Sequence, residues 1–371
     1  MPSPALIDVE SLVNPISDEN SVGADIRQDS SPASLYNQIK DARSAARAAE
    51  RHSLFDGDNS EAMSNWYKII DLAPEILQNH AKDLEVASWL TEALIRRAGF
   101  QGLRDGFAVI RGLIDNYWDS LYPLPDEEDG METRLASLTG LNGEGAEGVL
   151  IAPIRNVTIT EGGEPGPFSF WQYKQALDIQ KIADEDTRSK KAGKIGYTLE
   201  DIENAVASTD AEFYINLCDD VSISINEYRE ISRALDNLCG THESPPTSNI
   251  INTLEDALSV LKHVARFKLP VESSNEDDMG QDVTDINGTS VAGSSGVPAG
   301  AIKTREEAFR HLKNIANYFR KTEPHSPISY IIDKAVRWGD MDLDELMREL
   351  IPDSSSRDYY SSLTGVKTDE S

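Results

Sequence analysis

The stretch KDLEVASWLTEALIRRAG, residues 82–99, has the clearest secondary-structure pattern in the chain. Its apolar residues recur every three or four positions, as on one face of an amphipathic helix. These residues are Leu84, Ala87, Leu90, Ala93, Leu94 and Ala98. Gly99 ends the pattern, because glycine is common just beyond a helix C-terminus. The sequence therefore predicts a helix over 82–98.

Helical spacing of apolar residues extends through most of the chain on both sides of this stretch. Further patterns cover 34–49, 66–77, 103–117, 134–141, 168–183, 210–238, 250–267, 304–321 and 326–338. The exception is the Gly/Pro-rich segment 140–166, in which Val149–Ile159 has the β-branched composition of one or two short strands. We therefore expect a mainly α, multi-domain fold, with any strands confined to this segment.

The composition restricts both the partners and the compartment. The 371 residues include 35 Lys and Arg against 64 Asp and Glu, a net charge of −29. Such a chain repels nucleic-acid phosphates and anionic membrane surfaces. The longest apolar run, Val149–Ile154, is far shorter than the roughly 18 residues of a membrane span. No secretory signal precedes Arg27, and two cysteines are too few to staple the chain, so we expect a cytoplasmic protein.

Five parts are expected along the chain. Residues 1–33 are polar and expected to be extended, 34–175 form an N-terminal domain, and 176–270 form a helical middle domain. Residues 271–300 hold six acidic and no basic residues and are predicted to be a flexible linker. Residues 301–371 carry 11 basic and 13 acidic residues, a net charge of −2. This nearly neutral unit can associate with its own copies with little repulsion.

The usual motifs of catalysis are missing from the sequence. It contains no GxSxG, HExxH or P-loop pattern, and its six histidines do not cluster with cysteine at metal spacing. The GxGxxG match at 143–148 follows a helix and precedes a strand-like run, the reverse of a dinucleotide-binding turn. We therefore expect no enzyme activity, cofactor or metal. The alternative, an enzyme with an unrecognised site, requires a deep pocket near Cys218 or His263.

Two sets of motifs resemble one known family. The first comprises Asn14-Pro-Ile, Val22-Gly-Ala-Asp-Ile, Trp66-Tyr-Lys-Ile-Ile, the stretch that begins at Lys82, Gly99-Phe-Gln-Gly-Leu and Asn116-Tyr-Trp-Asp-Ser-Leu-Tyr-Pro. Over about 8–175 it resembles the ImpA-type N-terminal domain of the TssA family of bacterial type VI secretion systems. The second comprises Arg305-Glu-Glu-Ala-Phe-Arg-His-Leu, Phe319-Arg-Lys-Thr-Glu-Pro-His-Ser-Pro-Ile-Ser-Tyr and Ala335-Val-Arg-Trp-Gly. It resembles the short C-terminal domain of that family over about 302–365.

The resemblance implies a non-enzymatic assembly component of the secretion tail. Members form rings through their C-terminal domains and contact baseplate, sheath and tube proteins. Contact with the sheath-recycling ATPase is also implied. The alternative function is an acidic helical adaptor, without a ring, for a chaperone or for that ATPase. The mass of residues 301–371 in solution separates the two.

Nine residues are singled out for these contacts. Lys82, Asp83 and Trp89 are candidate partner contacts, although Asp83 also suits a helix N-terminus and Trp89 also suits a core. Large apolar groups are numerous for a unit of the size of 301–371, so some are expected to face neighbouring copies. The candidate oligomer interface is Phe309, Tyr318, Phe319, His325, Tyr330 and Trp338.

Overall fold

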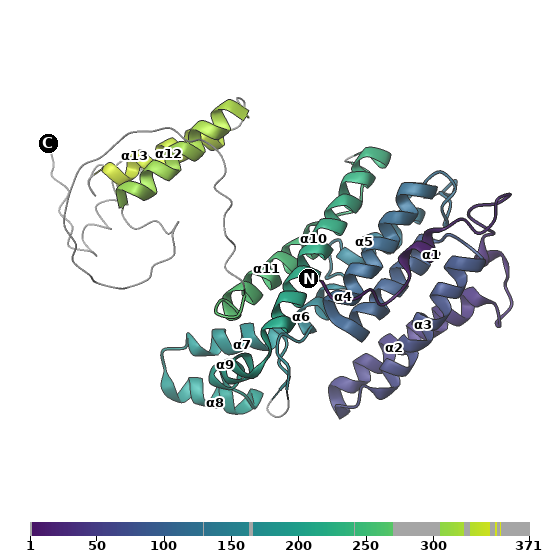
Figure 1. The fold of residues 1–371 in the computed structure, drawn as a ribbon, viewed down its shortest axis with the longest axis horizontal. Coiled ribbons are helices and arrows are strands. Elements are labelled where there is room, and N and C mark those ends of the chain that lie inside the picture. The colour runs from purple at the N-terminus through teal and green to yellow at the C-terminus, as the bar shows by residue number, and fades with distance from the viewer. Residues whose placement is uncertain are drawn as a thin grey trace, which may run out of the picture. The chain divides into compact units, whose positions relative to one another are not determined.

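The predicted helix over 82–98 is present as the first half of α4, which spans Leu84–Tyr117 (Figure 1). The helical path breaks at Ala98 and Gly99, where Gly99 takes a left-handed φ of 58°. After this break the second half folds back on the first. A Cβ built on Gly102 would lie 2.1 Å from the carbonyl oxygen of Leu94, and one on Gly106 would lie 2.6 Å from Oγ1 of Thr91. Glycine is therefore needed where the two halves touch.

The computed structural model describes residues 2–128, 130–162, 166–240, 242–269, 305–322 and 327–341, with Leu346 and Glu349. Side chains at 54–56, 306–308, 314, 318, 321, 322 and 340 lie outside this description. The helices of the described residues are α1 Val9–Val13, the 3-10 helix η1 Ile26–Gln28, α2 Leu35–Asp56, α3 Ser60–Asn79, α4 Leu84–Tyr117, α5 Met131–Asn142, α6 Ile151–Asn156, α7 Phe170–Gln180, α8 Glu185–Ile195, α9 Leu199–Ser208, α10 Ala211–Cys239, α11 Ser248–Val264, α12 Arg305–Thr322 and α13 Ile328–Asp340. The mainly α fold is confirmed.

The expected strands at Val149–Ile159 are wrong. This segment forms α6, and the described part contributes only an isolated bridge between Thr158 and Ser169. Helical spacing explains the outcome, because Ile151 and Ile154 lie on one face of α6 and are both buried. Residues 1–33 also differ from a wholly extended segment, since they contain α1 and η1.

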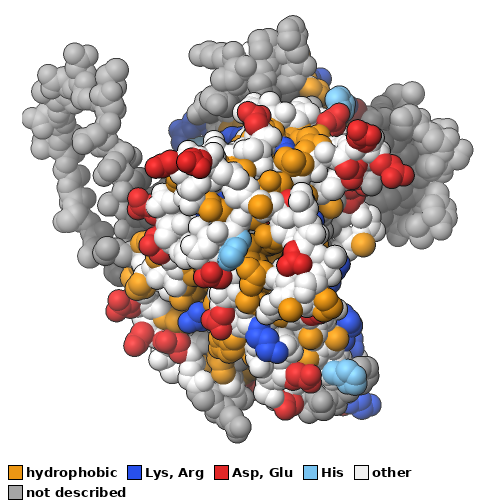
Figure 2. Space-filling view, turned by 90° about the vertical axis from the view of Figure 1, so that its right-hand side faces the viewer, with side chains coloured by type: hydrophobic (Ala, Val, Ile, Leu, Met, Phe, Trp, Pro, Cys, Tyr) orange, Lys and Arg blue, Asp and Glu red, His pale blue; other side chains and the backbone are white. Residues whose placement is uncertain are grey.

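The chain divides into two compact units, 1–275 and 276–371. In the first unit, α3 packs against both α2 and α4, and α10 packs along α4 and α11 (Figure 1). One hydrophobic core runs through it, from Leu12 to Ala265, across the expected boundary at 176. On the face shown in Figure 2, acidic side chains lie scattered among apolar and uncharged ones, in keeping with the net charge of −29.

The described part of the second unit is a helical hairpin of α12 and α13. The two helices lie close together at Gly339, where an added Cβ would lie 2.1 Å from Cζ of Phe309. Ala316, Ser329 and Val336 are buried between the helices. The expected linker 271–300 lies outside the described residues.

Candidate functional site

Lys82 joins three separate parts of the first unit. Its side chain has no exposed surface, and its Nζ donates hydrogen bonds to the carbonyl oxygens of Leu12 at 2.8 Å and Leu77 at 2.5 Å. Its backbone N–H donates to the carbonyl oxygen of Val22, and its carbonyl accepts from the N–H of Tyr122. Burial away from water lowers the pKa of Lys82 to about 8. The ammonium group therefore holds the N-terminal segment against α3.

Asp83 is the N-cap of α4 and the buried member of a partly exposed ion-pair cluster. Its Oδ1 accepts hydrogen bonds from the backbone N–H groups of Glu85 at 2.9 Å and Val86 at 3.0 Å. The Arg27 guanidinium lies 2.5 Å from Oδ2 of Asp83 and 2.6 Å from Oε2 of Glu85. Burial alone would lower the pKa of Arg27, but these two carboxylates raise it above its ordinary value.

Trp89 belongs to a row of aromatic and charged side chains between α2 and α4. Its ring stacks on Tyr36 with centroids 5.8 Å apart, and the Arg43 guanidinium lies 5.5 Å above it. Arg43 also pairs with the fully buried Glu92 at 2.5 Å. Further along, Glu50 on α2 pairs with Arg96 on α4. Tyr36, Arg43 and Glu50 repeat every seven residues along α2, so the row follows the helix axis.

Burial determines what the three predicted partner contacts can do. The exposed fractions are 0% for Lys82, 0% for Asp83 and 4% for Trp89. A partner cannot touch side chains that the fold covers, so direct contact does not fit this geometry. Their contribution to partner binding stays a prediction, and it can act only through the surface that they position.

The predicted oligomer-interface residues occupy different environments. Tyr330 is 65% exposed on α13, beside Ile331 at 61%, whereas Phe309, Phe319 and Trp338 are half-buried. The side chain of Tyr318 and the whole of His325 lie outside the described residues. Tyr330 is thus the member of this set that another copy can most readily reach, together with its exposed neighbour Ile331. Ile331 is among the large apolar residues of this unit, of which some are expected to face neighbouring copies, and it lies one helical turn from the exposed Ile328.

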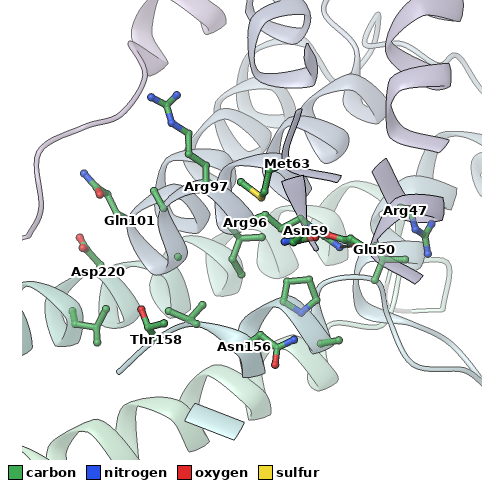
Figure 3. A pocket seen from close by; sticks show the side chains of 18 of the residues that line it. Arg47, Glu50, Asn59, Met63, Arg96, Arg97, Gln101, Asn156, Thr158 and Asp220 are labelled. Atoms are coloured by element: carbon green, nitrogen blue, oxygen red, sulfur yellow. Dashed lines mark hydrogen bonds and ion pairs between the residues drawn. The ribbon is translucent and has the colours of Figure 1, made fainter. Parts of the chain in front are cut away.

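A groove of about 1080 Å³ lies at the break in α4 (Figure 3). Five regions far apart in sequence line it: Ser3 near the N-terminus, the end of α2 with the start of α3, residues 95–101 of α4, residues 147–158 around α6, and the start of α10. Sequence reasoning missed this groove, because its walls meet only when α4 folds back and α10 packs along it.

The alternative of an enzyme site near Cys218 or His263 finds no support in the groove lining. Neither residue lines the groove, and burial raises the pKa of the Cys218 thiol to about 11, which disfavours the reactive thiolate. Within the described ranges, no three His, Cys, Asp or Glu side chains gather in a way that would hold a metal ion. In those same ranges no helix is both long and apolar enough to cross a bilayer.

Comparison with known proteins agrees with this architecture. The family described as "ImpA, N-terminal, type VI secretion system" matches residues 13–143. The type VI secretion system component TssA1 of Pseudomonas aeruginosa is 24% identical over 371 residues, covering 98% of this chain and 100% of the relative. The solved N-terminal domain of TssA from Burkholderia cenocepacia, which includes the ImpA_N region, superposes with a TM-score of 0.58 and 26% identity. That match covers 72% of this chain and 98% of the solved one.

These observations define the first unit as a helical domain of the ImpA N-terminal type. The similarity to TssA1 extends past this domain along the whole chain. Together these similarities support a protein of the TssA family of type VI secretion system components.

Proposed function

We propose that this chain is a structural assembly component of the type VI secretion tail in the cytoplasm of a Gram-negative bacterium. Its second unit assembles into a ring, and its first unit contacts baseplate, sheath and tube proteins. The observation that carries this proposal is the similarity to TssA1 over 98% of this chain and 100% of the relative, because both units are included. The role needs no catalytic residue, cofactor or metal.

The exposed face of α13 supports self-association. Tyr330 and Ile331 project from a hairpin that is too small to bury all of its own large apolar side chains. Complete burial of one such side chain against another copy contributes roughly 1.5–3 kcal/mol. A ring repeats that contribution at every interface, so a modest contact is enough for assembly.

The mass of the full-length protein in solution tests the proposal. We expect a species several times the 40.9 kDa of one chain, measured by light scattering coupled to gel filtration. Ile331→Asp should weaken association by about tenfold to a hundredfold, because it places a charge in the contact. Ile331→Leu, the matched control, should keep the assembly. A wild-type protein that stays monomeric at high concentration would contradict the ring and favour the acidic adaptor.

A further inference from the structure

The groove at the break in α4 carries an excess of positive charge within an acidic chain. Each acidic side chain of its lining has a basic partner inside the first unit. These pairs are Glu50 with Arg96, Glu147 with Arg155, and Asp220 with Arg104. The local negative charge is therefore already neutralised by the fold.

Three arginines of the lining lack such carboxylate partners within the described part of the chain. One of them, Arg97, lies over the ring of Tyr67, 5.9 Å from its centroid, and the other two are on α2. Arg47 and Arg51 lie one helical turn apart on α2, and among the described residues no carboxylate forms an ion pair with either. Burial lowers the pKa of Arg47 despite the attraction of Glu92, and the neighbouring guanidinium groups of Arg43, Arg96 and Arg51 lower it further. Burial is the larger cause of this lowered pKa, and the repulsion among the guanidinium groups adds to it. The guanidinium groups of Arg47 and Arg51 are thus available to an acidic ligand.

Free hydrogen-bonding groups lie elsewhere along the same groove. The side-chain amides of Asn59, Asn156 and Asn216 form no hydrogen bond with any other described residue. In Figure 3, Asn156 and Thr158 lie across the groove from Arg96, and Arg47 lies at the opposite end from Asp220. An amide offers both a donor and an acceptor, which matches the two polar groups of a peptide unit.

Apolar side chains complete the lining. Ile95 is 3% exposed, and Met63, Phe213 and Leu217 line the groove as half-buried groups. A small inorganic anion would leave this apolar surface and the separate amides unused. A polypeptide with carboxylate and apolar side chains uses all three kinds of group, and the volume of about 1080 Å³ admits several residues.

We propose that this groove binds an acidic, partly apolar peptide segment of a partner protein, with its carboxylates on Arg47 and Arg51. This inference rests on the proposed function, because the bound segment would belong to another protein of the secretion tail. Short-range contact is compatible with the net charge of −29, because charges beyond about 8 Å are largely screened at physiological salt.

Peptide binding to the full-length protein tests the groove. The probe is a fluorescein-labelled peptide of glutamate and leucine, compared by fluorescence anisotropy with a glutamine and leucine peptide of equal length. We expect the acidic peptide to bind at least about tenfold more tightly. Arg47→Glu combined with Arg51→Glu should remove this preference. Arg47→Gln with Arg51→Gln, a milder change, should weaken it partly.

The control pair is Arg229→Glu with Arg233→Glu, which makes the same change at the same spacing on α10. Both control residues have exposed acidic partners, so we expect little effect on folding or on peptide binding. An unchanged urea midpoint and circular dichroism spectrum establish that each variant is folded.

Four results would overturn the proposal. The first is equal binding of the two peptides, and the second is an equal loss of acidic-peptide binding in the control pair. The third is displacement of the peptide by comparable concentrations of phosphate or a DNA oligonucleotide, and the fourth is a changed mass of the Arg47 and Arg51 variant without peptide. The third would assign a phosphate site, and the fourth would assign a second copy as occupant. The proposed function fails separately, through a monomeric wild-type mass.

Discussion

The fold-back of α4 makes one glycine substitution a sharp test of the structure. At Gly102, an added Cβ would lie 2.1 Å from the carbonyl oxygen of Leu94 and 2.5 Å from its carbonyl carbon. Both are backbone atoms, so no rotation of a side chain relieves the overlap. Gly102→Ala therefore forces the two halves of α4 apart, close to the groove and to the core contact with α10.

Two opposing terms set the size of the effect. Overpacking a well-packed contact costs roughly 1–3 kcal/mol. Replacement of glycine by alanine inside a helix stabilises it by roughly 0.5–1 kcal/mol. The difference between the two terms is roughly 0–2.5 kcal/mol. Because the overlap of 2.1 Å is with a backbone atom, we expect Gly102→Ala to lower the free energy of unfolding by about 1–2 kcal/mol, within that range.

Gly140 provides the matched control. It is exposed inside α5, and a Cβ there would meet no described atom within 4 Å. Gly140→Ala should therefore raise the free energy of unfolding by about 0.5–1 kcal/mol, because only the helix-forming term remains. The two substitutions are chemically identical and differ only in tertiary surroundings.

Urea unfolding followed by tryptophan fluorescence measures both variants. Four of the five tryptophans, Trp66, Trp89, Trp118 and Trp171, lie in the first unit, so a Trp338→Phe background restricts the signal to that unit. Gly102→Ala should have the lower midpoint and Gly140→Ala the higher. If Gly102→Ala is as stable as Gly140→Ala, the two halves of α4 do not touch as described.

Two further predictions concern buried charges. The pKa of Lys82 is about 8 in the folded chain and 10.5 when unperturbed. Between these pH values the unfolded state binds more protons than the folded state. The stability of the wild type relative to Lys82→Met should therefore increase as the pH rises through that window. Urea midpoints below and above the window check this, and a constant difference would contradict it. Arg104→Leu leaves Asp105 and Asp220 buried without their cation and should cost about 3–5 kcal/mol. Adding Asp220→Asn should recover part of that loss, and a cost below about 1 kcal/mol would contradict the pairing.

The periodic parts of the fold could be predicted from the sequence. The helix predicted over 82–98 is confirmed from Leu84 onward, as is the break at Gly99, because apolar spacing and a glycine stop act within one or two turns. The prediction of short strands at Val149–Ile159 was wrong, because it relied on the β-branched composition and not on the helical spacing of Ile151 and Ile154. The helix buries both of these side chains, and their burial depends on elements that are distant in the sequence.

The candidate sites divide in the same way. Lys82, Asp83 and Trp89 were recognised as special from the sequence, but only the fold shows that they are buried.

The sequence by itself determined the helical class, the acidic charge and the family resemblance, because composition, periodicity and ordered motifs are properties of the linear chain. Only the tertiary structure decided the pairing of Arg27 with Asp83, 56 positions away, and the meeting of Arg47 with Asn156 and Asn216 around one groove. The physical reason is that such contacts depend on how the helices pack and on where α4 reverses. The local spacing of residues along the chain specifies neither.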